Sequence, residues 1–416
     1  MWVEDVIWWQ VFPLGFVGAP EHTEPQLTHR LPALVNWLDY LVELGASGIA
    51  LGPIFASTSH GYDTIDHLRI DSRLGDEQDF TRLVDEAHGR GIRVLLDGVF
   101  NHVGREFPRF QEVLEQGPEA PSANWFHLYW PEYEHFEGHR DLVTLNHDDP
   151  QVQDYVVEVM CHWLERGADG WRLDAAYAVP AEFWASVVPR VRERFPEAYL
   201  VGEVIHGDYA DYVQRSGLDS VTQYELWKST WSSLNEGNFF ELDWTLRRHD
   251  EWLESFVPLT FLGNHDTTRI ASKLTDLRHY PHALAILMTV GGTPSIYAGD
   301  EQGFRGIKRD QPGGDAEVRP AFPASPGELA PFGQDLFHLH QLLIGVRRRH
   351  RWLHTARTQT QHLTNTQLVY RVSAGDQSLR VALNIGDEPL PVGGGEVLAG
   401  QVWDGVVPAH GWAVLG

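Results

Sequence analysis

Short apolar segments alternate with longer segments of helical periodicity over the first 350 residues of the chain. Short apolar runs are typical of buried strands, whereas apolar residues that recur every three to four positions indicate amphipathic helices. The pattern predicts strands at residues 6–12, 48–51, 93–99, 170–174, 199–203, 220–224, 260–262 and 294–297. It predicts helices at residues 31–44, 79–89, 150–166, 180–195, 243–255, 279–289 and 329–349. Eight alternating units predict an α/β protein with a parallel (β/α)8 barrel of the TIM type.

Two segments interrupt this alternation. Residues 104–146 follow the third predicted strand, have no clean period, and are rich in aromatic and acidic residues. Because βα loops emerge at the carboxyl ends of barrel strands, we expect an inserted subdomain over the barrel mouth. From residue 351 to residue 416, period-two runs separated by Gly and Pro predict a small antiparallel β-sandwich domain. Residues 1–103 and 147–350 then form the barrel.

Charge and cysteine content exclude several classes of partner. The chain of 416 residues has 32 Lys and Arg against 58 Asp and Glu, a formal charge of −26, which opposes binding to nucleic acid or to an anionic membrane. A neutral or cationic ligand is favoured. The single cysteine, Cys161, excludes an intrachain disulfide. The sequence has neither a signal-like segment nor a run of about 20 apolar residues, so we expect a cytoplasmic protein; no pattern indicates an oligomeric state.

Four predicted strands place an acidic residue at their carboxyl end. In the strand at 170–174, period two puts Arg172 and Asp174 on the face opposite two bulky apolar residues, so both should face the barrel lumen. Glu203 and Asp97 end two further strands, and Asp266 follows a fourth. All four acids are therefore expected at one rim.

Acids in such positions have two interpretations. Any one of them could simply cap the next helix or pair with a nearby cation. Four of them on one rim favour catalysis, because crowded carboxylates repel, and the pKa of one rises to separate a general acid from an ionised nucleophile. Two carboxyl groups of this kind are the machinery of glycoside hydrolysis.

The segments that carry these acids resemble the four ordered sequence regions of the α-amylase superfamily of glycoside hydrolases. They are Asp97-Gly-Val-Phe-Asn-His102, Gly170-Trp-Arg-Leu-Asp174, Gly202-Glu-Val-Ile-His206 and Phe261-Leu-Gly-Asn-His-Asp266. Further similar segments are Gly61-Tyr-Asp-Thr-Ile-Asp66 and Ile296-Tyr-Ala-Gly-Asp-Glu301. The resemblance extends from about residue 8 to residue 319.

The resemblance implies a role for each matching residue. Asp174 is implied to be the nucleophile, Glu203 the acid/base, and Asp266 the group that stabilises the transition state. Other matching positions are implied to bind substrate. They are Tyr62, Asp97, His102, Arg172, His206, His265, Asp315 and Arg319.

The sequence is most similar to the neopullulanase, cyclomaltodextrinase and maltogenic amylase branch. The segments 202–206, 133–146 and 315–319 carry this similarity. Val143 and Thr144 stand where that branch usually has Pro-Lys, and the N-terminal β domain of the branch has no counterpart, because the first strand begins by residue 6. The branch implies a retaining hydrolase that cleaves α-1,4-glucosidic bonds of malto-oligosaccharides, with α-1,6 bonds as a further option.

Two other functions use the same barrel. One is a transglycosylase, such as a glucanotransferase or an isomerising synthase, which forms the same glycosyl-enzyme and differs only in its acceptor. The other is a catalytically inactive barrel that serves as a binding subunit, which the presence of all three catalytic acids disfavours.

No cofactor is expected. The sequence has neither zinc-ligand spacing nor a phosphate-binding glycine loop. Asn101 matches a position that helps to bind calcium in many members of the superfamily, but a hydrogen-bonding turn residue explains it equally well. A complete oxygen cage cannot be identified in the inserted segment, so we predict no metal site.

Overall fold

Eight parallel strands form a closed barrel in the computed structural model, which describes residues 2–22, 26–311 and 313–416. Their order around the sheet is β12-β11-β10-β5-β2-β1-β14-β13. A parallel bridge between Thr222 and Leu259 joins the two edge strands and closes the barrel. The strands are β1 (Trp8–Val11), β2 (Gly48–Leu51), β5 (Arg93–Gly98), β10 (Gly170–Leu173), β11 (Tyr199–Gly202), β12 (Ser220–Val221), β13 (Leu259–Phe261) and β14 (Thr293–Tyr297). The predicted TIM barrel is confirmed.

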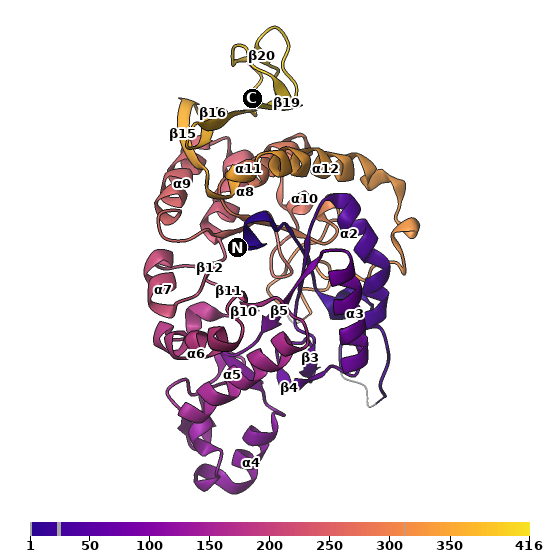
Figure 1. Cartoon of the computed structure of the whole chain (residues 1–416), viewed down its shortest axis with the longest axis vertical. Helices are drawn as coiled ribbons and strands as arrows, with labels where there is room; N and C mark the ends of the chain where they lie inside the picture. Colours follow the sequence, from indigo (N-terminus) through magenta and orange to yellow (C-terminus); the bar gives the residue numbers. More distant parts are fainter. Residues whose placement is uncertain (1, 23–25, 312) are drawn as a thin grey trace.

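Helices surround the barrel (Figure 1). The longer ones are α2 (Leu38–Leu44), α3 (Glu77–Gly89), α5 (Pro150–Glu165), α6 (Ala181–Arg194), α7 (Tyr209–Ser216), α8 (Tyr224–Glu236), α9 (Phe239–Trp252), α11 (Tyr280–Thr289) and α12 (Gln334–Arg349). Two short helices, α1 (Pro13–Phe16) and α10 (Ile270–Lys273), lie in loops. No helix in the described ranges is both long enough and apolar enough to cross a membrane.

The barrel strands separate an outer core from a lumen core. On β10, Trp171 and Leu173 belong to the core beneath the helices, whereas Arg172 points into the lumen. A second apolar cluster fills the lumen below the strand ends. It includes Trp8, Leu95, Tyr199, Val201 and Phe261. Polar side chains therefore concentrate at the rim.

The structure corrects the predicted elements at several places, and α7 between β11 and β12 also lies outside the predicted helices. The strand expected at 220–224 ends at Val221, and Tyr224 begins α8, which the periodicity does not predict. The reason is that α8 buries hydroxyl side chains at positions that would be apolar in an ordinary amphipathic helix. Ser229 and Thr230 donate to the carbonyl oxygen of Leu226, and Ser232 donates to Glu241 on α9. The helix expected at 31–44 is a 3-10 helix (Leu31–Trp37) followed by α2. The hairpin of β3 (Phe55–Ser57) and β4 (Thr64–Ile70) was not predicted.

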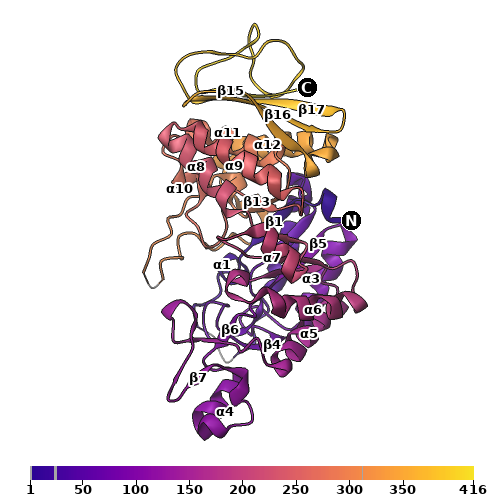
Figure 2. The same ribbon diagram turned by 90° about the vertical axis from the view of Figure 1, so that its left-hand side faces the viewer.

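The segment after β5 leaves the barrel and returns to it. The strands β6 (His102–Gly104) and β9 (Leu142–Thr144) pair antiparallel at its base. Beyond them lie α4 (Pro108–Gln116), β7 (Leu128–Tyr129) and β8 (Glu132–Tyr133). Figure 1 and Figure 2 both place α4 at the end of the molecule opposite the C-terminal strands.

The C-terminal strands form an antiparallel domain, as expected. The five-stranded sheet has the order β15-β16-β17-β21-β19, and β18 pairs with β20. An apolar cluster that includes Val369, Leu390 and Val407 lies between the two sheets. The strands are β15 (Arg357–Leu363), β16 (Gln367–Ala374), β17 (Gln377–Asn384), β18 (Leu390–Pro391), β19 (Val397–Gly400), β20 (Val406–Val407) and β21 (Trp412–Leu415).

Candidate active site

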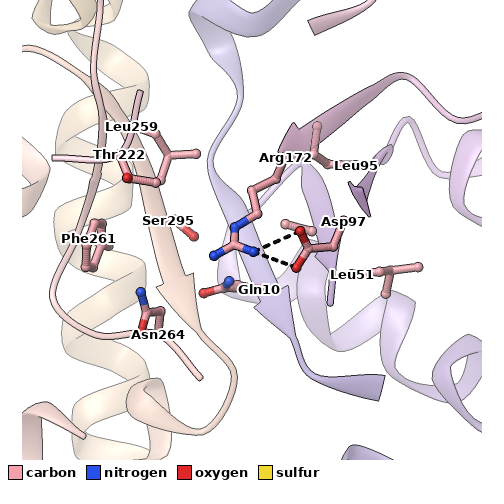
Figure 3. Close-up of a pocket in the computed structure, with 11 residues that line it drawn as sticks. Gln10, Leu51, Leu95, Asp97, Arg172, Thr222, Leu259, Phe261, Asn264 and Ser295 are labelled. Carbon is pink, nitrogen blue, oxygen red and sulfur yellow. Dashed lines mark hydrogen bonds and ion pairs between the residues drawn. The ribbon is translucent and has the colours of Figure 1, made fainter. Parts of the chain in front are cut away.

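Arg172 brings three carboxylates together at the barrel rim. In the sheet register Arg172 lies directly beside Asp97 of β5. Its Nη1 donates to both oxygens of Asp97 at 2.8 Å and to Oδ1 of Asp174 at 2.9 Å, while Nη2 lies 2.6 Å from Oε1 of Glu203. Figure 3 shows the pair between Arg172 and Asp97. All four side chains are buried, so one cation holds three predicted site acids in fixed positions.

Close approach of two strands places this cluster. Gly170 begins β10, and a Cβ atom there would lie 2.1 Å from the carbonyl oxygen of Tyr199 on β11. Only glycine fits so close to a neighbouring backbone. The absence of a side chain at Gly170 lets β10 and β11 lie this close. Because Leu173 pairs with Gly202, the next residues, Asp174 and Glu203, lie side by side just beyond the strand ends.

The cluster carries an excess of buried negative charge. Burial raises the pKa of Asp174 well above its ordinary value; Arg172 opposes this shift, and the carboxylates of Glu203 and Asp97 reinforce it. Burial likewise raises the pKa of Asp97, again against the pull of Arg172. Because these groups interact strongly, they titrate as a unit that binds protons more readily than isolated carboxylates do.

Both oxygens of Glu203 are held by donors. The hydroxyl of Tyr224 donates to Oε1 at 3.0 Å, and the backbone N–H of Ala175 donates to Oε2 at 3.0 Å. Asn264 in turn donates to the hydroxyl oxygen of Tyr224 at 2.8 Å. Tyr224 was not among the predicted site residues. Its position after β12 is nevertheless similar to the positions of Asp174 and Glu203 after β10 and β11. Asn264, which lies within the motif that ends at Asp266, was also not among the predicted site residues.

Replacement of Tyr224 by phenylalanine is expected to lower kcat by about tenfold, because a hydrogen bond to a charged group contributes about 1.5–3 kcal/mol. Steady-state kinetics on a malto-oligosaccharide, the substrate class that the sequence resemblance implies, would measure this loss. Tyr370→Phe is a matched control, because Tyr370 is also buried but its hydroxyl contacts Thr289 under the C-terminal domain. An unchanged kcat in Tyr224→Phe would show that the hydroxyl does not position Glu203.

Asp266 lies between a histidine and an arginine. Its Oδ2 is 2.9 Å from Nε2 of His265, and its Oδ1 accepts from Nη2 of Arg319 at 2.6 Å. Although burial alone would raise the pKa of Asp266, His265 and then Arg319 hold it well below the ordinary range. A third of this side chain is exposed, against about a tenth for Asp174 and Glu203. Asp266 is therefore ionised and open to the mouth.

An aromatic stack supports the Asp266 side of the site. The ring of His265 stacks on Tyr62, with centroids 5.6 Å apart, and on Phe12, with centroids 5.8 Å apart. Gln10 contacts Nδ1 of His265 at 3.2 Å, and the hydroxyl of Tyr62 donates to Asp97 at 3.2 Å. Sequence analysis missed Phe12 and Gln10, which are ordinary first-strand residues in the sequence and are revealed only by the closed barrel.

His102 faces the inserted segment. Its ring stacks on Phe136, with centroids 4.8 Å apart, and burial lowers its pKa to about 3, so the imidazole is neutral. Asn101 lies 3.1 Å from Nδ1, which leaves Nε2 without a side-chain partner in the described part of the chain. A free N–H group at this position can donate to a hydroxyl of a ligand.

The remaining predicted residues lie farther from the acids. Asp315 contacts Nη2 of Arg319 at 3.0 Å and also pairs with Lys308, so it approaches the site through Arg319. His206 is exposed at the rim, where its ring lies 5.5 Å from that of Tyr177. It is thus separate from the central cluster.

A small cavity lies in the lumen beneath the acids. Its volume is about 30 Å³, far below the roughly 300–1,000 Å³ of pockets that enclose a ligand. Figure 3 shows Arg172 and Asp97 on one side of it and Asn264 and Phe261 on the other. This cavity is therefore too small to enclose a ligand.

Asn101 contacts the histidine that follows it. Its side-chain nitrogen lies 3.1 Å from Nδ1 of His102. Within residues 2–22, 26–311 and 313–416, two groups of His and Asp could hold a cation, and neither includes a residue near Asn101.

Two sequence families match the chain. Residues 10–335 match the family described as alpha amylase, catalytic domain, and residues 356–415 match a domain of unknown function, DUF3459. The first match includes the barrel strands β5 to β14 and the inserted segment.

Individual relatives and solved structures agree with these matches. A cyclomaltodextrinase of Bacillus sp is 31% identical over 92% of this chain and 73% of its own length. Neopullulanase 2 of Thermoactinomyces vulgaris is 32% identical over 92% of this chain and 70% of its own length. A debranching enzyme of Nostoc punctiforme has a TM-score of 0.84 at 28% identity, over 100% of this chain and 98% of its own. A cyclic alpha-maltosyl-(1→6)-maltose hydrolase of Arthrobacter globiformis has a TM-score of 0.84 at 25% identity.

Proposed function

Because the chain belongs to the α-amylase family of glycoside hydrolases, we propose that Asp174, Glu203 and Asp266 are its catalytic residues. The family activity is hydrolysis of α-glucosidic bonds with retention of configuration. The observation that carries the assignment is the position of Arg172, whose guanidinium binds Asp174 and Glu203 on adjacent strands at once. Retaining enzymes need their two carboxyl groups only about 5 Å apart, and a shared guanidinium supports such a spacing.

Hydrolysis then proceeds in two displacements. The carboxylate of Asp174 attacks the anomeric carbon while the carboxyl group of Glu203 protonates the glycosidic oxygen, so the bond to the leaving sugar breaks and a glycosyl-enzyme forms. Glu203, now ionised, takes a proton from water, and the resulting oxygen nucleophile releases the sugar from Asp174. The ionised Asp266 stabilises the positive charge that develops on the ring.

The residues around the acids bind the substrate. His102 donates to a hydroxyl group of the sugar in the cleaved subsite, and Tyr62 supplies an aromatic face beneath it. His265, whose ring nitrogens contact Asp266 and Gln10, binds the same sugar through the carboxylate of Asp266 that it positions. Asp315 and Arg319 contact a neighbouring unit, while Arg172 and Asp97 form the floor. The exposed His206 is placed to meet the leaving sugar.

We propose malto-oligosaccharides and cyclomaltodextrins as substrates, with cleavage of α-1,4 and also α-1,6 bonds. Two of the similar proteins are named for cyclomaltodextrin and for cyclic alpha-maltosyl-(1→6)-maltose. The neutral imidazole of His102 and the aromatic ring of Tyr62 suit an uncharged sugar. Incubation with maltotriose, a cyclodextrin, pullulan, trehalose and sucrose, followed by chromatography, tests this. Products longer than the substrate would instead identify a transglycosylase.

Proton NMR during the first turnovers is expected to show the α-anomer as the initial product, because two inversions at the anomeric carbon restore its configuration. Asp174→Asn serves as the control for uncatalysed mutarotation. The β-anomer as first product would refute the covalent role of Asp174.

A further inference from the structure

Two histidines and an aspartate meet where the barrel contacts the C-terminal domain. Asp276 caps the 3-10 helix Leu277–His279, His279 ends that helix just before α11, and His410 precedes β21. One ligand atom from each lies within 4.8 Å of the other two. Nε2 of His279 and Nδ1 of His410 are 3.0 Å apart, although the residues are 131 positions apart in sequence.

The distance between the two nitrogens suits a shared metal ion. Zinc binds imidazole nitrogen at about 2.0–2.1 Å, so two ligands at a tetrahedral angle lie about 3.3 Å apart. The observed separation is only slightly shorter. Asp276 supplies the third ligand. The backbone N–H and the guanidinium of Arg278 already donate to both oxygens of Asp276, at 2.6–3.1 Å, so a metal ion would displace one of these donors when it binds.

A second carboxylate prepares His410 as a ligand. Nε2 of His410 lies 3.1 Å from Oδ1 of Asp387, which fixes the proton on Nε2 and turns the lone pair of Nδ1 toward His279. Metal-binding histidines in proteins usually donate their other N–H to a carboxylate in this way.

Solvent can reach the three side chains, and contacts between the barrel and the C-terminal domain hold them together. The side chain of Asp276 is 31% exposed and that of His410 is 18% exposed, which leaves room for entry and for a water ligand. Beside these side chains, Nε2 of His282 on α11 contacts the carbonyl oxygens of Asn384 and Gly411 at 3.0 and 2.9 Å. The C-terminal domain therefore holds His410 in place.

We propose that Asp276, His279 and His410 form a binding site for zinc or a similar divalent transition-metal ion, which links the C-terminal domain to the barrel. The metal would replace the hydrogen bond between the two imidazoles. This role is independent of catalysis, because the site lies at the domain contact and not at the barrel mouth.

The other His and Asp group provides an internal control. His29, Asp76 and Asp79 also lie close together. However, Asp76 and Asp79 form the capping box of α3, and the side chain of His29 is 55% exposed. Asp276 also caps a short helix, so the difference lies in the histidines: one exposed imidazole makes a poorer site than two imidazoles that face each other.

The test is titration of the tag-free full chain, stripped with a chelator, with zinc chloride in a calorimeter. We expect one saturable site per chain and a rise in the midpoint of thermal unfolding that EDTA reverses. His279→Gln and His410→Gln should abolish that binding, and His29→Gln should retain it. Asp387→Asn should weaken it about 10-fold to 100-fold.

If a histidine variant fails to fold, Asp387→Asn still tests the proposal. The side chain of Asp387 is 97% exposed, so its replacement leaves the packing of the domain unchanged. Its effect is read from zinc affinity, so a failure of the proposed enzymatic function would not alter the result. Absence of saturable binding by the wild type, or equal binding by the wild type and His410→Gln, would overturn the proposal. Loss of binding in His29→Gln alone would assign the metal to the other group.

Discussion

Asp174→Asn and Glu203→Gln are each expected to lower kcat on maltotriose by at least about 10²-fold. General acid-base catalysis contributes about 10² to 10⁴ in rate, and loss of the nucleophile removes the covalent route altogether. Both substitutions preserve shape, so they remove chemistry and leave packing intact. Retention of more than about a tenth of the activity by either variant would contradict its role.

The control for these variants is an exposed carboxylate. Asp154→Asn on α5 removes a charge that pairs with Arg190 at the surface. Its kcat should equal that of the wild type. Cooperative thermal unfolding of all three variants would confirm that activity losses come from the site itself.

Arg172→Met is expected to lower both activity and stability. The substitution leaves Asp97, Asp174 and Glu203 buried without their shared cation, and removal of one partner from a buried ion pair costs about 3–5 kcal/mol. Urea denaturation would measure this loss. Arg190→Met is the matched control, because its surface pair contributes about 0–1 kcal/mol. Equal stability of the two variants would contradict the role of Arg172 as the counterion.

The same substitution should move the pH profile. Asp174 must be ionised to attack, and burial already raises its pKa above the ordinary value of about 3.9. Arg172 opposes that rise, so its loss raises the pKa of Asp174 further. The acid limb of kcat/KM should therefore shift to higher pH in Arg172→Met, and an unchanged limb would argue against ionisation of Asp174 as its cause.

The central acids were predictable because they depend on local rules. Period two set Arg172 opposite Trp171, and parallel strands end at one rim, so Asp97, Asp174 and Glu203 could be placed together from their positions alone. The closed barrel confirms this expectation. The domain boundaries at residues 103/104, 146/147 and 350/351 stay predictions.

Residues that act through closure of the barrel could not be predicted in the same way. Phe12 and Gln10 reach His265 only because β1 pairs with β14. Tyr224 was assigned to a strand, since its helix buries hydroxyl groups that obscure the apolar period. Their signals are contacts between distant segments, which a pattern along one chain does not contain.

Within the described barrel, strand pairing is weakest around β12, which lies next to the strand of Glu203 but not next to the strand of Asp174, the two carboxylates that we propose to be catalytic. β12 pairs with β11 over two residues, and a single bridge at Thr222 joins it to β13, whereas β10 pairs over four residues on each side. Transient opening should therefore begin at β12, and amide hydrogen exchange at Thr222 should be faster than at Arg172. Local opening at β12 would free Tyr224 and so loosen Glu203, the proposed proton donor. Asp174, the proposed nucleophile, would stay fixed, because β10 is paired on both sides.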